Sequence, residues 1–97
     1  MLELYGYGVT IKRVTFKNNT YSIFACNGIK SIHFEISELR KYCIGEISFN
    51  FKMLSIYDLY NNKLYTNEKY FKKYDSICTH IAIYIVDHLH ELEKEIV

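Results

Sequence analysis

Apolar and polar residues alternate along the first third of the chain, as is typical of β-strands that are buried on one face. Three stretches carry this pattern and are rich in β-branched and aromatic residues: Val9 to Phe16, Tyr21 to Cys26 and Ile29 to Phe34. The alternation changes phase at Lys12-Arg13, where we expect a β-bulge. Together these stretches predict a three-stranded antiparallel meander over roughly residues 9–35.

Short polar segments separate these strands and predict tight turns. Lys17-Asn18-Asn19-Thr20 suits a hairpin, because asparagine tolerates the left-handed conformation that such turns require. Asn27-Gly28 is a stronger hairpin signal. We expect a type I′ turn there, with positive φ at both of these residues.

The segment after the meander predicts a short helix and a further strand. Ser37 can cap a helix near residues 37–43, and Gly45 stands where that helix would end. From Glu46 to Met53 the alternation is strict, which predicts a half-buried strand.

A second hairpin is expected before the chain becomes helical. Ile56 to Tyr60 and Lys63 to Thr66 have strand character, and Asn61-Asn62 between them supplies turn residues. The next stretch, Asn67 to Tyr74, fits either a helical turn or a loop.

From Asp75 onward the spacing of apolar residues changes to the period of an α-helix. One side of the predicted helix is apolar and consists of Cys78, Ile81, Ala82, Ile85, Val86, Leu89, Leu92 and Ile96. The other side carries His80, Tyr84, Asp87, His88, Glu91, Lys94 and Glu95. Asp75 or Ser76 is expected to cap the first turn. The β-branched run from Ile81 to Val86 leaves a strand as the alternative.

These elements predict one α+β domain spanning residues 1–97. Its sheet is expected to consist of antiparallel hairpins, about five strands in all, packed by the C-terminal amphipathic helix. A chain of 97 residues has the length of one domain with a single core.

The amino-acid composition indicates the type of genome that encodes the protein and the cellular compartment in which it acts. Ile, Lys, Asn, Tyr and Phe make up nearly half of the chain, and their codons are rich in A and T. This bias indicates an AT-rich bacterial genome, or a phage or mobile element within one. The three cysteines, Cys26, Cys43 and Cys78, are odd in number and widely spaced, which favours reduced thiols in the cytoplasm. No apolar run is long enough to span a membrane, and no signal segment is evident.

The sequence does not predict an enzyme, a metal site or a cofactor. The HExxH spacing of zinc proteases is absent, and the phosphate-binding patterns GxGxxG and GxxxxGK[ST] are absent as well. No glycine-flanked elbow marks a serine or cysteine as a nucleophile. We therefore expect a non-enzymatic protein.

One candidate binding surface is basic and aromatic. Lysines and aromatic residues alternate closely between residues 63 and 74: Lys63, Tyr65, Lys69, Tyr70, Phe71, Lys72, Lys73 and Tyr74. Lysines follow phosphates and aromatic rings stack on bases, so this composition is typical of proteins that bind single-stranded nucleic acid. The formal net charge of the whole chain is only +1, which is low for a strong phosphate binder.

A second candidate surface is acidic. On the predicted C-terminal helix, Asp87, Glu91 and Glu95 recur every four residues beside Tyr84. Carboxylates at this spacing line one face of a helix at intervals of about 6 Å. Such a row can imitate a phosphate backbone and occupy a cationic groove on a partner.

Three functions from different classes remain open at this point. The first is a small protein-binding module, such as an inhibitor, an immunity protein or an anti-defence protein resembling anti-CRISPR proteins in role, with a protein target that itself binds nucleic acid. The second is a small nucleic-acid-binding or regulatory protein. The third is an enzyme, which the missing motifs disfavour. Self-association as a homodimer is a further expectation, should one sheet face not cover both Ile83 and the apolar stripe.

Overall fold

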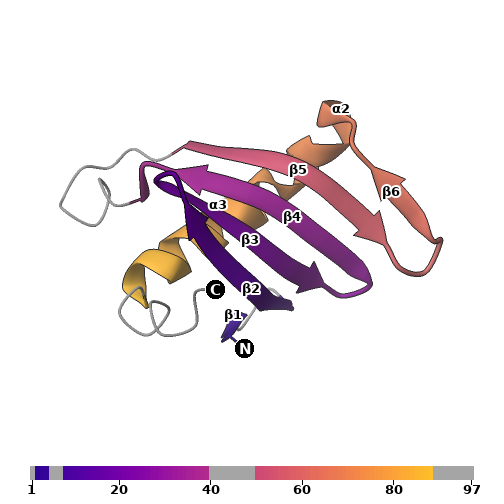
Figure 1. Ribbon diagram of the computed structural model, residues 1–97. Coiled ribbons are helices and arrows are strands. Elements are labelled where there is room, and N and C mark those ends of the chain that lie inside the picture. Colours follow the sequence, from indigo (N-terminus) through magenta and orange to yellow (C-terminus); the bar gives the residue numbers. More distant parts are fainter. Residues whose placement is uncertain (1, 5–7, 40–49, 89–97) are drawn as a thin grey trace.

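The computed structural model describes residues 2–4, 8–39 and 50–88, whose arrangement is shown in Figure 1. Within these residues, six strands form one sheet, and each strand pairs antiparallel with its neighbours along the chain. A helical segment follows the last strand and lies across one face of the sheet. The predicted α+β class, with antiparallel hairpins packed by a helix, is confirmed.

The strands follow one another across the sheet in chain order. They are β1 Leu2–Leu4, β2 Val9–Lys17, β3 Thr20–Asn27, β4 Lys30–Ser37, β5 Asn50–Asp58 and β6 Lys63–Tyr65. The long strands β2, β3 and β4 are the meander predicted over residues 9–35. The described sheet has one strand more than the five or so expected, and β1, which pairs with the start of β2, was not predicted.

The bulge expected at Lys12-Arg13 is present in β2. Ile11 and Arg13 lie opposite consecutive residues of β3, so Lys12 is the extra residue. An extra residue reverses the alternation of inward and outward side chains. For this reason both Ile11 and Val14 are buried, although they are three residues apart and regular alternation would place them on opposite faces.

The two turns of the meander differ in how well the sequence predicts them. Asn18-Asn19 forms the first turn with φ of 53° and 59°, as expected. In the second, Asn27 pairs with Lys30, so the central residues are Gly28 and Ile29. Gly28 has φ of 62° and Ile29 has no positive φ, which is the pattern of a type II′ turn. The predicted type I′ turn centred on Asn27-Gly28 is wrong, because the glycine occupies the first central position.

The strand β5 joins two segments that the sequence predicts as separate strands. Met53 and Ser55 lie opposite consecutive residues of β4, so Leu54 is the extra residue of a second bulge. This bulge interrupts the alternation, and the pattern therefore resembles a break between two strands. Of the strand predicted over 46–53, residues 46–49 lie outside the described part of the chain.

The second hairpin turns earlier than predicted. Asp58 pairs with Lys63, and the residues between them form a four-residue turn. The prediction that β5 continues through Tyr60 is wrong. The cause is the Asp58 side chain, which accepts hydrogen bonds from the backbone N–H groups of Tyr60 and Asn61 and so bends the chain two residues sooner.

Three helical pieces follow the sheet without a break: α2 Glu68–Phe71, the 3₁₀ turn η1 Lys72–Tyr74, and α3 Asp75–Asp87. Of the two alternatives for the segment before Asp75, the helical one is therefore correct. No side-chain hydrogen bond caps the start of α3, and the predicted cap at Asp75 or Ser76 is wrong. The Asp75 N–H instead donates to the carbonyl of Lys72 in the preceding 3₁₀ turn.

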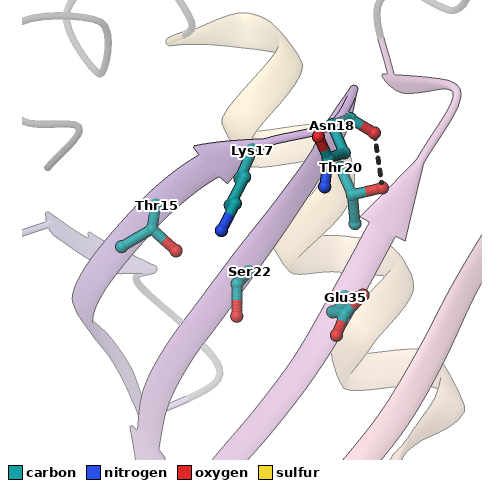
Figure 2. Close-up of a pocket in the computed structure, with 6 residues that line it drawn as sticks. All are labelled: Thr15, Lys17, Asn18, Thr20, Ser22 and Glu35. Atoms are coloured by element: carbon teal, nitrogen blue, oxygen red, sulfur yellow. Dashed lines mark hydrogen bonds between the residues drawn. The ribbon is translucent and has the colours of Figure 1, made fainter.

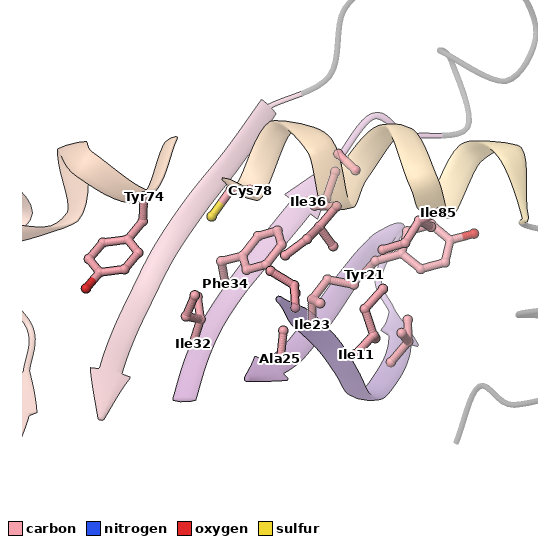
Figure 3. Packing of buried hydrophobic residues seen from close by; sticks show 14 of the residues in the cluster. Ile11, Tyr21, Ile23, Ala25, Ile32, Phe34, Ile36, Tyr74, Cys78 and Ile85 are labelled. Atoms are coloured by element: carbon pink, nitrogen blue, oxygen red, sulfur yellow. The ribbon is translucent and has the colours of Figure 1, made fainter. Parts of the chain in front are cut away.

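The helix α3 covers one face of the sheet, as Figures 1 and 3 show. Its buried residues all belong to the predicted apolar stripe: Cys78, Ile81, Ala82 and Ile85. They pack against inward side chains of β2 to β5, among them Ile23, Phe34 and Ile56. The strand alternative for the run after Ile81 is wrong, because the helical period places the buried residues on one side.

The thiol of Cys78 is part of this core. Its side chain is completely buried, and burial raises the pKa of the thiol to about 12. A thiol with such a pKa stays protonated at neutral pH, and a protonated thiol is a poor nucleophile. Cys78 therefore acts as a small apolar side chain.

Several predictions fall on residues that the structure leaves undescribed. Most of the helix expected near 37–43 lies in residues 40–49, and Leu89, Leu92 and Ile96 of the predicted stripe lie in residues 89–97. Ser37 is the last residue of β4, and its hydroxyl donates to the carbonyl of Asn50 at 3.4 Å. Among the described helices, none has the length and apolar character that crossing a membrane requires.

Candidate functional site

Four large apolar side chains are exposed where two hairpins meet at one end of the sheet. Ile29 (51% exposed) lies in the β3–β4 turn, and Leu59 (56%) and Tyr60 (82%) lie in the β5–β6 turn. Leu64 (58%) follows on β6. The Leu59 N–H donates to the Ile29 carbonyl at 2.9 Å, which joins the two turns (Figure 1). We call these four residues the hairpin-tip patch.

The carboxylate of Asp58 holds this patch in shape. It is only 3% exposed, and its Oδ1 accepts the backbone N–H groups of Tyr60 and Asn61 at 3.0 and 3.1 Å. Its Oδ2 accepts the Asn61 side-chain amide at 3.0 Å and the Lys30 ammonium at 3.2 Å. Lys30 belongs to β4, so one carboxylate ties both turns together. The patch is thus presented on a backbone with little freedom to rearrange.

The same contacts make the turn sensitive to acid. The hydrogen bonds from the backbone and side chain of Asn61, and the neighbouring Lys30 ammonium, lower the pKa of Asp58 from 3.8 to about 2. A carboxyl whose pKa is lower when folded binds protons more readily when unfolded. Its contribution to stability is therefore complete above about pH 4 and is lost as the pH falls toward about 2.

We expect the β5–β6 turn to open selectively in that range. Amide hydrogen exchange of Tyr60 and Asn61, compared with that of the buried Ile23, should accelerate as the pH falls through about 3, after correction for the intrinsic rate. In Asp58→Ala, which removes the acceptor oxygens, these amides should exchange rapidly already at neutral pH. Asp75→Ala, which removes an exposed carboxylate at the start of α3, is the matched control and should protect these amides as wild type does. Unchanged protection in Asp58→Ala would contradict the assignment.

Beside the patch, three tyrosines assemble into a stack that joins β6 to the helical segment. Tyr65 and Tyr70 lie face to face, with ring centroids 4.0 Å apart and planes 12° apart. Tyr74 is tilted against Tyr70 at 5.7 Å, and the two hydroxyls are 3.3 Å apart. We call Tyr65, Tyr70 and Tyr74 the tyrosine stack.

Two lysines cover the outer faces of the stacked Tyr65 and Tyr70 rings. The Lys73 ammonium lies 4.1 Å from the Tyr70 ring centroid, and the Lys63 ammonium lies 5.0 Å from that of Tyr65. Each of these two rings has one face against the other tyrosine, so each ammonium lies over the remaining face. The order in space is Lys63, Tyr65, Tyr70, Lys73. Cation–π contacts of this kind stabilise the arrangement while the ammonium groups stay in contact with water.

The tyrosine hydroxyls continue the polar network of the patch. The hydrogen bond from Tyr74, together with nearby Lys30 and Lys73, lowers the pKa of Tyr70, whereas burial raises the pKa of Tyr74 above its usual value. Lys30, which binds Asp58, also interacts with the Tyr70 hydroxyl. The patch and the stack are therefore parts of one connected surface.

The structure thus brings together most of the residues predicted for nucleic-acid binding. Lys63, Tyr70 and Lys73 form one cluster, and Lys69 and Lys72 are exposed on α2 and η1. What the sequence does not reveal is that the rings stack on one another. Base stacking on Tyr65 or Tyr70 requires Lys63 or Lys73 to leave its ring.

Only part of the predicted acidic surface lies in the described residues. Asp87 is exposed at the end of α3, and the Tyr84 ring stacks on that of His88 at 4.1 Å. Glu91 and Glu95 lie in residues 89–97, so the carboxylate row remains a prediction. His88 directs its Nδ1 toward the Tyr84 carbonyl at 2.9 Å.

The sheet face opposite α3 carries a second feature, a row of three side chains from neighbouring strands, which the sequence pattern does not predict. Arg13, Phe24 and His33 lie side by side across β2, β3 and β4. The guanidinium lies 4.3 Å from the Phe24 ring, which stacks on His33 at 3.9 Å and 14°. Ser22 contacts the His33 Nε2 at 2.8 Å. Burial lowers the pKa of His33, and Arg13 lowers it further against the opposing effect of Glu35.

A shallow polar hollow lies on this same face, near the β2–β3 turn. Figure 2 shows the side chains that line it: Thr15, Lys17, Asn18, Thr20, Ser22 and Glu35. Its volume is about 320 Å³, and it is broadly open to solvent. The mixed charge of Lys17 and Glu35 and the absence of a deep wall make it a weak candidate for a ligand site.

No family model, no curated protein and no solved structure matches this chain. The candidate surfaces therefore rest on the geometry described above.

The sequence contained a signal for the Arg13–Phe24–His33 row but not for the hairpin-tip patch. Phe24 stands in the polar phase of its strand, between the inward residues Ile23 and Ala25, and an aromatic residue in that phase faces away from the core. The sequence pattern predicts a strand through Leu59 and Tyr60, where burial is expected. Their exposure follows from the early turn at Asp58.

Proposed function

We propose that this chain is a small, non-enzymatic protein-binding module that acts in the cytoplasm, and that its target is a protein bound at the hairpin-tip patch. The observation that carries the proposal is the rigid exposure of Ile29, Leu59, Tyr60 and Leu64. Exposed apolar side chains gathered from separate segments and fixed by buried polar contacts are typical of protein interfaces. A fixed turn also loses little conformational entropy on binding.

The biological role that best suits such a module is inhibition. Its small size and the AT-rich composition fit an inhibitor, immunity or anti-defence protein of the anti-CRISPR kind, carried by a phage or mobile element. A surface centred on Tyr60 resembles the aromatic hot spots that dominate binding energy in many complexes. The acidic residues Asp87, Glu91 and Glu95 beside Tyr84 remain a second proposed contact, directed at the cationic groove of a nucleic-acid-binding effector. Homodimer formation is also retained as a proposal.

A small nucleic-acid-binding or regulatory protein is the second candidate. It is favoured by the clustering of Lys63 and Lys73 with exposed Lys69 and Lys72. Against it, the lysine-capped rings of the tyrosine stack are closed to bases. The protein-binding proposal is therefore preferred.

Site-specific photocrosslinking in the cytoplasm of an AT-rich bacterial host tests the proposal. A crosslinking side chain in place of Tyr60 should capture one defined protein. The same group in place of Lys17, at the opposite end of the sheet, should not. The captured protein, purified, should bind Leu59→Asp about 30-fold more weakly than wild type, as expected for a central contact.

Two results would refute the assignment of this surface. One is the same captured protein at both crosslinking positions. The other is unchanged affinity for Leu59→Asp when circular dichroism shows that the variant is folded.

A further inference from the structure

The segment that follows the hairpin-tip patch in the chain carries mostly positive charge. Between residues 59 and 74 there are four lysines, Lys63, Lys69, Lys72 and Lys73, against the single carboxylate of Glu68. All four lysines are exposed. The nearby carboxylate of Asp58 is buried and already bound to Lys30 and the turn. Lys63 directly follows the β5–β6 turn, and Lys73 lies over the ring of Tyr70, whose hydroxyl interacts with Lys30. We call these two lysines the basic border of the patch.

The border is fixed in position by the tyrosine stack. Lys63 and Lys73 each lie over a ring, at 5.0 Å from Tyr65 and 4.1 Å from Tyr70. A long side chain resting on an aromatic face samples fewer conformations than a free one, and it loses less entropy when it pairs with a charge. Leu64 of the patch lies between Lys63 and Tyr65 in the chain, and the alternation of β6 directs its side chain to the opposite side of the strand from theirs, so the apolar and the basic side chains occupy the two sides of one strand.

This geometry discriminates between two classes of anionic partner. A single-stranded nucleic acid gains much of its affinity from stacking bases on aromatic faces. The facing rings of Tyr65 and Tyr70 are 4.0 Å apart, and their outer faces lie under lysines. Tyr74 is only 5% exposed. The exposed aliphatic groups of Ile29, Leu59 and Leu64 offer nothing that a phosphate backbone recognises, whereas they fit an apolar depression in a protein.

We propose that the partner bound at the hairpin-tip patch is an acidic protein surface, in which an apolar depression for Leu59 and Tyr60 is bordered by carboxylates that pair with Lys63 and Lys73. This inference rests on the proposed function. It adds the chemistry of the partner and assigns the lysines predicted for nucleic acid to carboxylates instead of phosphates.

Selection from a library of displayed random peptides tests the inference with the full chain as bait. Some peptides should bind the wild-type bait but not the Leu59→Asp bait. We expect these peptides to be enriched in aspartate and glutamate next to aromatic or aliphatic residues. A selected peptide should bind Lys63→Gln/Lys73→Gln roughly tenfold more weakly, as expected for two exposed charge pairs. Its affinity for wild type should also fall as salt shortens the screening length from about 10 Å.

The control variant is Lys12→Gln/Lys17→Gln, which changes the net charge by the same amount at exposed positions on β2. It should leave affinity for the peptide unchanged. Urea denaturation of both double variants verifies that each is folded.

The remaining outcomes separate the two proposals. Peptides that depend on Leu59 but lack acidic residues would overturn the inference and leave the proposed function standing. If no peptide distinguishes wild type from Leu59→Asp, both fall. Oligothymidylate that binds wild type more tightly than the best peptide and is lost on Lys63→Gln/Lys73→Gln would overturn the inference in favour of nucleic acid.

Discussion

Replacing Phe34 by alanine should destabilise the protein by ~3–5 kcal/mol, because the side chain is completely buried and its removal leaves a cavity in a close-packed core. Phe34 lies on β4 and faces α3, with Phe51 edge-on at 6.4 Å. A domain of this size has a total stability of only ~5–10 kcal/mol. Urea denaturation followed by circular dichroism should therefore show a midpoint lowered by a large fraction of its wild-type value.

Phe24→Ala is the matched control, since it deletes the same side chain from the neighbouring strand but on the opposite face. Phe24 is only partly buried, between Arg13 and His33, and we expect a loss of about 1–2 kcal/mol. Equal losses for the two variants would contradict a sheet with one covered face. The chain has no tryptophan, so tyrosine fluorescence supplies a second, independent signal.

On α3, Ile81→Ala should cost ~2–4 kcal/mol, whereas Ile83→Ala should change stability by less than about 0.5 kcal/mol. Ile81 is fully buried against the sheet, and Ile83, two residues further, is 38% exposed. The substitution is chemically identical at both positions, and alanine favours the helix equally at each. Only the packing against the sheet differs between them.

Denaturant titrations of these two helix variants measure the docking of α3 directly. Similar destabilisation by both would mean that Ile83 is also covered, as in a homodimer formed through the outer side of the helix. Sedimentation of wild type at two concentrations then decides whether a second copy covers it.

Much of the fold follows from local pattern alone. The alternation in β2, β3 and β4 identifies which side chains point inward, and the change of period at Asp75 identifies a helix with Cys78, Ile81, Ala82 and Ile85 on its buried side. These signals are local because one side of each strand or helix faces the core and the other faces water, whichever elements pack against it. The bulge at Lys12 was also predictable, since an extra residue leaves a visible slip in the alternation.

The pairing of residues between β3 and β4 was harder to predict than the face of the sheet to which each side chain points. The predicted turn at Asn27-Gly28 would place Cys26 opposite Ile29, whereas Cys26 lies opposite Ser31. The shift is an even number of residues, so every side chain keeps its face and only the pairs across the strands change. The Phe24–His33 stack is one such pair, and it was missed for that reason.

The candidate site depended still more on contacts between distant segments. Composition indicates that Lys63, Lys69, Tyr70, Lys72 and Lys73 form a basic aromatic surface, and the structure brings Lys63, Tyr70 and Lys73 of this set together. Whether tyrosine rings stack on bases or on one another is decided by the distance between β6 and α2, which no local pattern contains. The hairpin-tip patch depends in the same way on Lys30 of β4 binding Asp58 on the neighbouring strand β5.

By itself, the sequence determined the meander of β2 to β4, the helix α3, the inward face of each, and the residues available for recognition, because these depend on side-chain periodicity and turn chemistry within a few residues. Only the tertiary structure decided which residues are paired and which surface is exposed. A single buried carboxylate, Asp58, ends β5 early and places Leu59 and Tyr60 in solvent. Tyr60 and Asn61, which bind this carboxylate, belong to the same turn, whereas Lys30 comes from another hairpin, and its contact with Asp58 forms only when the sheet is assembled.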